Sequence, residues 1–160
     1  ADDNCEIPGE AEKIEQELLH LLGRVSIEGV SPTTIGIDVD CERVSERDGH
    51  LVHVEVELNR EASLSEIKEW MAAWSDRPQH LKLPSAPDSP VIIIDGLPSR
   101  EIYLMAGGEG LKSGMSVVVG NLKMDKATLS FSALSHNTIR GAAGGCILLA
   151  ELMHAEGLLD

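Results

Sequence analysis

Hydrophobic residues recur every three or four positions in three stretches of the chain. These stretches cover residues 9–22, 64–75 and 138–156, and each would place its apolar side chains on one face of a helix. At the start of the second stretch, Ser63 and Glu66 have the spacing of a capping box, in which each side chain bonds the backbone N–H of the other residue. The pattern therefore predicts three amphipathic helices.

The remaining regular stretches have patterns that are typical of strands. Residues 33–44 and 50–58 alternate along their length, and residues 115–122 and 127–134 are two apolar-rich runs joined by a short turn. Residues 91–94 form a short apolar run of the kind found in buried strands. We expect strands at all five places, with the last two paired as a hairpin.

The strand predicted at 50–58 separates two kinds of side chain. Val52, Val54 and Val56 point to one face, whereas His53 lies on the other face with two glutamates. His50 has the same parity as the valines. We therefore expect His50 at the mouth of the apolar face, and we expect His53 to be solvated.

The order of these elements predicts an α+β domain with a mixed, largely antiparallel sheet and helices packed on one face. A length of 160 residues suits a single domain of ordinary size. Residues 76–90 and 95–114 are rich in Pro, Ser or Gly and are expected to be loops. The second loop is long enough to cover a site or to meet a partner.

Composition narrows the range of functions. The net charge of −14, from 27 acidic and 13 basic residues, repels nucleic-acid backbones, and only two Trp, one Tyr and one Phe are present to stack on bases. No apolar run is long enough to span a membrane, and the three cysteines show no metal-ligand spacing. We expect a cytoplasmic protein that binds neither nucleic acid, nor membranes, nor a metal.

The stretch at residues 41–50 carries the most chemistry. Arg43 has a guanidinium suited to a carboxylate or phosphate, and His50 is of the residue type that exchanges protons near neutral pH. Asp48-Gly49 between them is a turn signal, and a turn there can bring both side chains to one side. The alternative is a surface hairpin with two solvated side chains.

A second candidate is the start of the last predicted helix. Gly141, Gly144 and Gly145 lie in its first two turns beside Arg140. Small residues at this place permit either tight packing against the sheet or the approach of a flat ligand to the helix N-terminus. The sequence leaves both possibilities open.

The same region, Ser135-His136-Asn137-Thr138-Ile139-Arg140-Gly141-Ala142-Ala143-Gly144, resembles the C-terminal end of aspartate-semialdehyde dehydrogenases of the archaeal and fungal branch. Four further matches follow the order of that family along the chain. They lie at residues 9–13, at 41–44 with 48–50, at 83–85 with 90–92, and at 114–120.

The resemblance implies a fold like the C-terminal domain of glyceraldehyde-3-phosphate dehydrogenase and a homodimer formed through the sheet. It also implies that residues 1–137 are the catalytic and dimerisation domain, and that residues 138–160 are a helix that packs back on an NADP-binding domain. The chain holds neither the cofactor fingerprint nor the cysteine motif of the family's nucleophile. We therefore expect the chain alone to be inactive.

Enzymes of this family reduce L-aspartyl 4-phosphate to L-aspartate 4-semialdehyde with NADPH through a cysteine thioester, in the biosynthesis of lysine, threonine and methionine. The resemblance also implies a role for each matched residue. The general acid–base is His50, the clamp for the substrate α-carboxylate is Arg43, the ligand of its amine is Glu10, the phosphate contact is Lys13, and the residue near the nicotinamide is Asn137.

The chain departs from the family pattern at four positions, which are Glu42, Ser45, Glu46 and Asn121. The departures add negative charge beside an anion site, so they bear on substrate identity. Two alternatives therefore stay open. One is a malonyl-CoA reductase on the same scaffold, whose substrate has no amine for Glu10, and the other is a non-enzymatic interaction domain.

Overall fold

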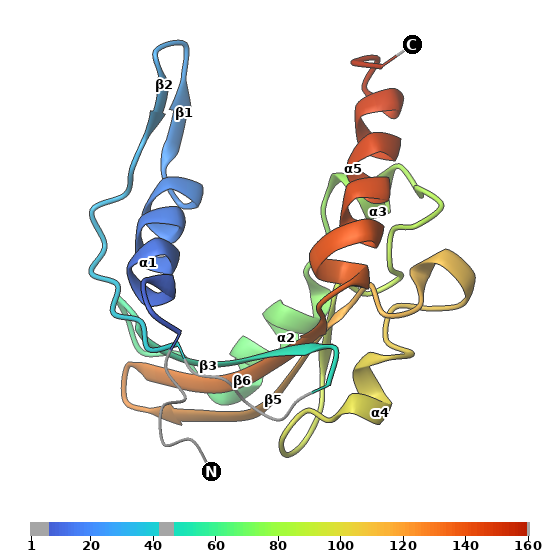
Figure 1. Cartoon of the computed structure of the whole chain (residues 1–160). Coiled ribbons are helices and arrows are strands. Elements are labelled where there is room, and N and C mark those ends of the chain that lie inside the picture. Colours follow the sequence, from blue (N-terminus) through green and yellow to red (C-terminus); the bar gives the residue numbers. More distant parts are fainter. Residues whose placement is uncertain (1–6, 42–46, 160) are drawn as a thin grey trace. The chain divides into compact units, whose positions relative to one another are not determined.

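The computed structural model describes residues 7–41 and 47–159. The chain divides into two compact units, Ala1–Ser45 and Glu46–Asp160. In the described residues, the first unit holds one helix and a small hairpin, and the second holds a four-stranded sheet with the other helices. Figure 1 labels most of these elements along the chain.

The first unit begins with the predicted amphipathic helix. Helix α1 (Glu10–Leu21) is followed by the antiparallel strands β1 (Arg24–Ser26) and β2 (Gly29–Ser31). Gly23 lets the chain come close to β2, because a Cβ there would lie 2.3 Å from the carbonyl oxygen of Ser31. The helix predicted at 9–22 is confirmed, whereas the short hairpin was not predicted.

The strand predicted at 33–44 is wrong for the part that the structure describes. Residues 33–41 form no strand, and residues 42–44 lie outside the described residues. The side chains of this segment still alternate in exposure: Ile37, Val39 and Cys41 are half-buried, and the aspartates between them are exposed. Alternation makes a strand only where a neighbouring strand supplies hydrogen-bond partners, and the pairing described in this unit joins β1 to β2.

The second unit is built on a sheet with the strand order β3-β6-β5-β4. Strands β3 (Gly49–Glu57), β6 (Thr128–His136) and β5 (Val117–Asp125) are antiparallel neighbours, and β4 (Val91–Ile93) runs parallel to β5. The prediction of a mixed, largely antiparallel sheet in an α+β fold is therefore confirmed.

Helix α2 (Leu64–Ala73) covers one face of the sheet. It begins with the predicted capping box, in which the side chains of Ser63 and Glu66 each accept the other residue's backbone N–H. Its apolar side packs on the sheet through a buried cluster that consists of Ile67, Val119, Leu122 and Leu129.

The one-turn helix α4 (Arg100–Tyr103) lies on the opposite face. Tyr103 packs with Val118 and Leu134, which pair across β5 and β6. Val118 precedes Val119 of the other cluster, and successive strand residues point to opposite faces. The loop predicted at 95–114 thus folds over one end of the second face.

The remaining elements are short, apart from the last helix. They are α3 (Arg77–His80), the 3₁₀ turn η1 (Gly110–Lys112), the π-turn η2 (Ile139–Ala143) and α5 (Gly144–Ala155). The helix predicted at 138–156 therefore starts as a π-turn and continues as an α-helix. Among the residues described, no helix combines the length and the apolar character needed to cross a membrane.

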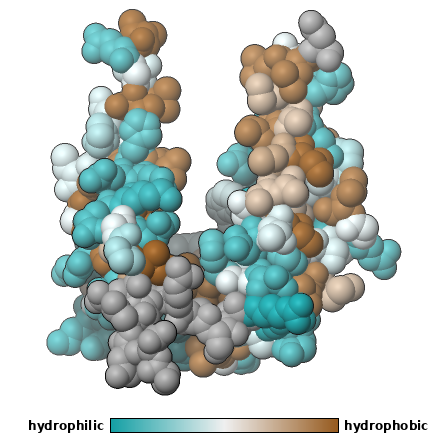
Figure 2. Space-filling model, in the orientation of Figure 1, coloured by the Kyte–Doolittle hydropathy of each residue, from teal (hydrophilic) through white to brown (hydrophobic). Residues whose placement is uncertain are grey.

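Helix α5 is tied by a carboxylate to the loop between α3 and β4. The backbone N–H and the hydroxyl of Ser85, a residue only 1% exposed, both donate to Glu151, at 3.0 and 2.8 Å. Other positions of α5 remain open, since Ile147 is 47% exposed and Leu149 is 56% exposed. In Figure 2, apolar surface extends along this helix.

Candidate functional site

The turn before β3 is the centre of the candidate site. Asp48 has a left-handed backbone with φ of 59°, which Asp adopts more readily than most residues. The N–H of Asn137 donates to the carbonyl of Asp48 at 2.8 Å, and Gly49 pairs with His136. The turn therefore joins the start of β3 to the end of β6.

His50 and Asn137 are brought together at this end of the sheet. His50 pairs with Ser135 in the ladder, lies on the same face as Val52, and has an exposed side chain. Asn137 is also exposed and follows directly after β6. The face predicted for His50 from the alternation of β3 is therefore confirmed.

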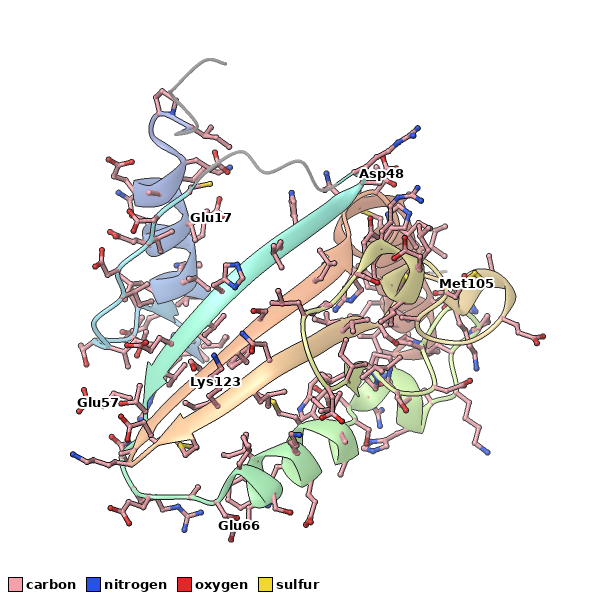
Figure 3. The ribbon with its side chains drawn as sticks, turned by 90° about the horizontal axis from the view of Figure 1, so that it is seen from below. Glu17, Asp48, Glu57, Glu66, Met105 and Lys123 are labelled. Atoms are coloured by element: carbon pink, nitrogen blue, oxygen red, sulfur yellow. The ribbon has the colours of Figure 1, made fainter. Side chains whose placement is uncertain are left out.

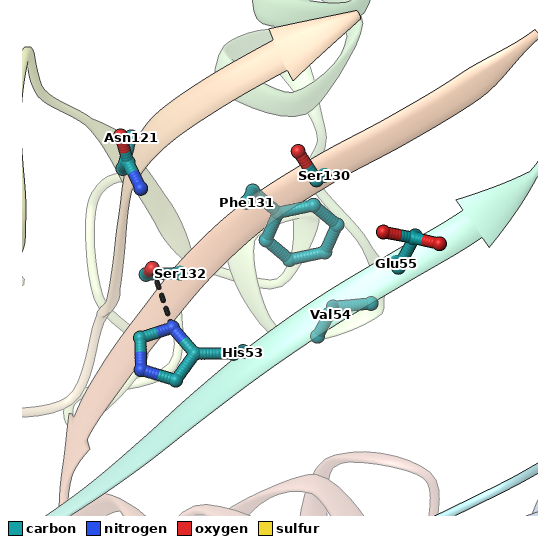
Figure 4. Close-up of a pocket in the computed structure, with 7 residues that line it drawn as sticks. All are labelled: His53, Val54, Glu55, Asn121, Ser130, Phe131 and Ser132. Carbon is teal, nitrogen blue, oxygen red and sulfur yellow. Dashed lines mark hydrogen bonds between the residues drawn. The ribbon is translucent and has the colours of Figure 1, made fainter. Parts of the chain in front are cut away.

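His53 lies on the other face of β3 and lines a shallow depression of about 200 Å³. Its Nδ1 lies 2.8 Å from the Oγ of Ser132. Figure 4 draws this hydrogen bond as a dashed line. Asn121 lines the same depression and has a left-handed φ of 52°, at the irregular register between β5 and β6. His53 is exposed as predicted, but the cross-strand bond to Ser132 was not predicted.

The glycines at the start of the last helix differ in the space around them, which bears on the two possibilities left open by the sequence: tight packing and the approach of a ligand. A Cβ at Gly144 would lie 2.6 Å from the sulfur of Met115, and one at Gly145 would lie 2.7 Å from the carbonyl oxygen of Arg140. Gly144 is therefore required for packing against Met115, and Gly145 is required by the backbone of the preceding helical turn at Arg140. A Cβ at Gly141 would meet nothing closer than 3.7 Å, so this exposed position leaves space for a ligand.

Glu10 and Lys13 occupy the first turn of α1 in the other unit. The Nζ of Lys13 donates to the carboxylate of Glu10 at 3.2 Å. The hydrogen bond to Glu10 and the charges of Glu10 and Glu17 raise the pKa of Lys13. The pair therefore presents an ammonium that stays protonated and a carboxylate on one helix face.

Arg43 lies outside the described residues, as do Glu42, Ser45 and Glu46. Two contacts to the turn before β3 were not predicted from the sequence: Tyr103 donates a hydrogen bond to the carbonyl of Arg47, and Arg100 pairs with Asp48. No local pattern marks such long-range contacts. Within the described part of the chain, no group of three or more His, Cys, Asp or Glu side chains is placed to hold a metal ion.

No family model matches the chain. Over 151 residues it is 40% identical to an aspartate-semialdehyde dehydrogenase of Methanothermobacter thermautotrophicus, and the match covers 92% of this chain and 43% of that protein. Over 153 residues it is 35% identical to a malonyl CoA reductase (NADP) of Metallosphaera sedula, and the match covers 92% of this chain and 42% of that protein.

Among solved structures, the fold is similar to that of aspartate semialdehyde dehydrogenase with NADP from Candida albicans. The TM-score is 0.83 with 27% identity, and the match covers 98% of this chain and 45% of that one. The chain thus spans less than half the length of the relatives it matches.

Proposed function

Because this chain is homologous to the C-terminal part of aspartate-semialdehyde dehydrogenases, we propose that it is the substrate-binding and dimerisation part of an NADP-dependent enzyme of that kind. The reaction is the reductive dephosphorylation of L-aspartyl 4-phosphate to L-aspartate 4-semialdehyde, carried out in the cytoplasm by a homodimer. The observation that carries the proposal is the similarity to such enzymes of both an archaeon and a fungus along more than nine-tenths of the chain.

His50 is assigned the proton transfers. When a cysteine sulfur adds to the semialdehyde carbonyl, the oxygen gains a proton, and it loses that proton again when the thioester forms. His50 gives and retrieves this proton, since its side chain is exposed at the start of β3. The cysteine is assigned to the part of the enzyme that the longer relatives possess beyond the matched region.

Three charged residues are assigned to the substrate's charged groups. Arg43 clamps the α-carboxylate with its planar fork of donors. Glu10 binds the substrate amine and Lys13 binds phosphate. The 3.2 Å ion pair between Glu10 and Lys13 supports this assignment, because an incoming ammonium and an incoming phosphate can each replace one partner of the pair.

The start of the last helix fits a nicotinamide, which is a flat ring with a carboxamide. Asn137 offers an exposed side-chain amide, and Gly141 leaves open surface beside it. NADP, when bound, supplies or accepts the hydride of the reaction. Asn137 orients the carboxamide by hydrogen bonds.

The division into residues 1–137 and 138–160 belongs to the same proposal. The first part is the catalytic and dimerisation domain, and the second is a helix that packs on the nucleotide-binding domain. The exposure of Ile147 and Leu149 on α5 supports this division, since both are large apolar side chains of the kind that a domain contact buries.

The proposal is tested in the full-length protein that contains this chain. NADP reduction is measured with L-aspartate 4-semialdehyde and phosphate, for the wild type, His50→Asn and His53→Asn. We expect His50→Asn to lower kcat about 100-fold, as loss of a general acid–base does. His53→Asn is the matched control on the other face of β3 and should stay within about twofold. Equal kinetics in all three proteins would contradict the site.

Malonyl-CoA reduction is the second candidate, favoured by the similarity to the Metallosphaera sedula enzyme. Its substrate has no amine, so Glu10→Gln should leave malonyl-CoA reduction unchanged but raise the KM for L-aspartate 4-semialdehyde. A wild type that reduces malonyl-CoA with NADPH but has no activity with L-aspartate 4-semialdehyde would favour this candidate. Activity with neither substrate would favour a non-enzymatic interaction domain.

A further inference from the structure

Two side chains of α4 hold the turn that leads into β3. The hydroxyl of Tyr103 donates to the backbone carbonyl of Arg47, 56 residues earlier in the chain. The Nη2 of Arg100 lies 3.5 Å from the carboxylate of Asp48. Together with the Asn137–Asp48 backbone bond, these contacts attach the turn to two elements that are distant in sequence.

Tyr103 is enclosed on all sides. Its side chain is 0% exposed and packs with Val118 and Leu134. Its ring meets the ring of His136 edge-on, with centroids 5.7 Å apart and an interplanar angle of 82°. The ring is therefore fixed by the core, and Tyr103 has no exposed surface through which to contact a substrate.

Tyr103 and His50 lie on opposite faces of β3. Leu51 packs on the Tyr103 cluster, and successive side chains of a strand alternate between faces. The exposed His50 therefore points away from the core that holds Tyr103. Tyr103 therefore contacts the start of β3 from one face, and the side chain of His50 lies on the other face.

Residues at the end of a strand need such support. Gly49 and His50 form the first two pairs of β3 with β6, and terminal pairs open most easily. Asp48 before them is in the left-handed region, and Gly49 restricts the backbone little. Without an anchor at Arg47, the direction of the His50 side chain would vary.

From this geometry we infer that Tyr103, assisted by Arg100, is a positioning residue that fixes the direction of His50 for proton transfer. The inference rests on the role proposed for His50. Misplacement of a catalytic group by a fraction of an ångström lowers the rate without removing the group. The structural part of the inference, the anchoring of residues 47–50, holds independently of the reaction.

The test compares Tyr103→Phe with Ser116→Ala in the full-length protein. Phe keeps the ring in the core and removes only the hydroxyl. Ser116 is a matched control because it is also 0% exposed and donates its hydroxyl to a backbone carbonyl, that of Ser89. In Tyr103→Phe, but not in Ser116→Ala, we expect amide hydrogen exchange in a peptide spanning residues 47–52 to become about tenfold faster. We also expect the kcat of Tyr103→Phe with L-aspartate 4-semialdehyde to fall about tenfold, while its KM stays within about twofold of the wild-type value.

A double variant shows whether Tyr103 acts through His50. In a His50→Asn background, Tyr103→Phe should cause no further loss of kcat. Unchanged exchange at residues 47–52, a rise in KM alone, an unchanged kcat, or additive losses in the double variant would each overturn the inference. A wild type without semialdehyde activity would instead reject the proposed function, and the exchange measurement would still decide whether Tyr103 anchors the turn.

Discussion

At the scale of single residues, the backbone of Asp48 decides which side chains the turn accepts. Its φ of 59° is unfavourable for Ala and tolerable for Asn, and both substitutions remove the charge that faces Arg47 and Arg100. Asp48→Ala should therefore lower the free energy of unfolding by about 1 kcal/mol more than Asp48→Asn, measured by urea denaturation. Equal losses in the two variants would assign the effect to charge and contradict a backbone cause.

The sequence could predict the face of His50 but not what supports it. The face follows from parity along β3, which needs only local alternation. The hydroxyl of Tyr103 reaches Arg47 across 56 residues, and the loop that carries Tyr103 has no repeating pattern. Contacts of this kind follow from the tertiary fold, so single residues in irregular loops could not be assigned from the sequence.

At the scale of elements, the capping box of α2 makes the stability of the helix depend on pH. Hydrogen bonds from the side chain and the backbone of Ser63 lower the pKa of Glu66. A carboxylate with a lowered pKa stabilises the folded state above its unfolded pKa, and that contribution is lost as the pH falls through the folded pKa. The wild type should thus be more stable than Glu66→Gln at pH 7, and the difference should close in acid.

The measurement is urea unfolding of both proteins at neutral pH and in steps down to about pH 3. Glu69→Gln is the control, since Glu69 is exposed on the same helix and lies outside the capping box. A gap between the wild type and Glu66→Gln that stays constant with pH, or an equal gap for Glu69→Gln, would contradict the role of the ionised cap.

Element prediction succeeded where a local signal and a tertiary partner agreed. Helix α2 has both its capping box and an apolar side that meets the sheet, and β5 and β6 are joined by a short turn. The segment 33–41 has the alternation but no described ladder partner, so it does not form a strand. Strand prediction fails in this way because pairing is a non-local property.

At the scale of the whole molecule, the sheet of the second unit has one face that is only partly covered. Helix α4 and its loop cover the end near Val118, while His53, Ser130 and Ser132 line the other end of the same face. Figure 3 shows this face, with Lys123 at the far end and Met105 in the loop over the covered end. The sequence resemblance implied a homodimer formed through the sheet, and we propose the open area of this face as the contact.

The homodimer is tested on this open area. Ser130 is half-buried in the sheet face, so Ser130→Arg would place a long cation there without disturbing the core beneath α2. We expect light scattering of the full-length protein at micromolar concentration to show a dimer for the wild type and a shift towards monomer for Ser130→Arg. The long side chain would hold the two sheet faces apart, and its charge is costly to bury even opposite Glu55, which pairs with residue 130 across the strands. Ser65→Arg, on the exposed side of α2, is the matched control and should remain dimeric. A monomeric wild type would reject the dimer, and a dimer that survives Ser130→Arg but not Ser65→Arg would move the contact to the helical face.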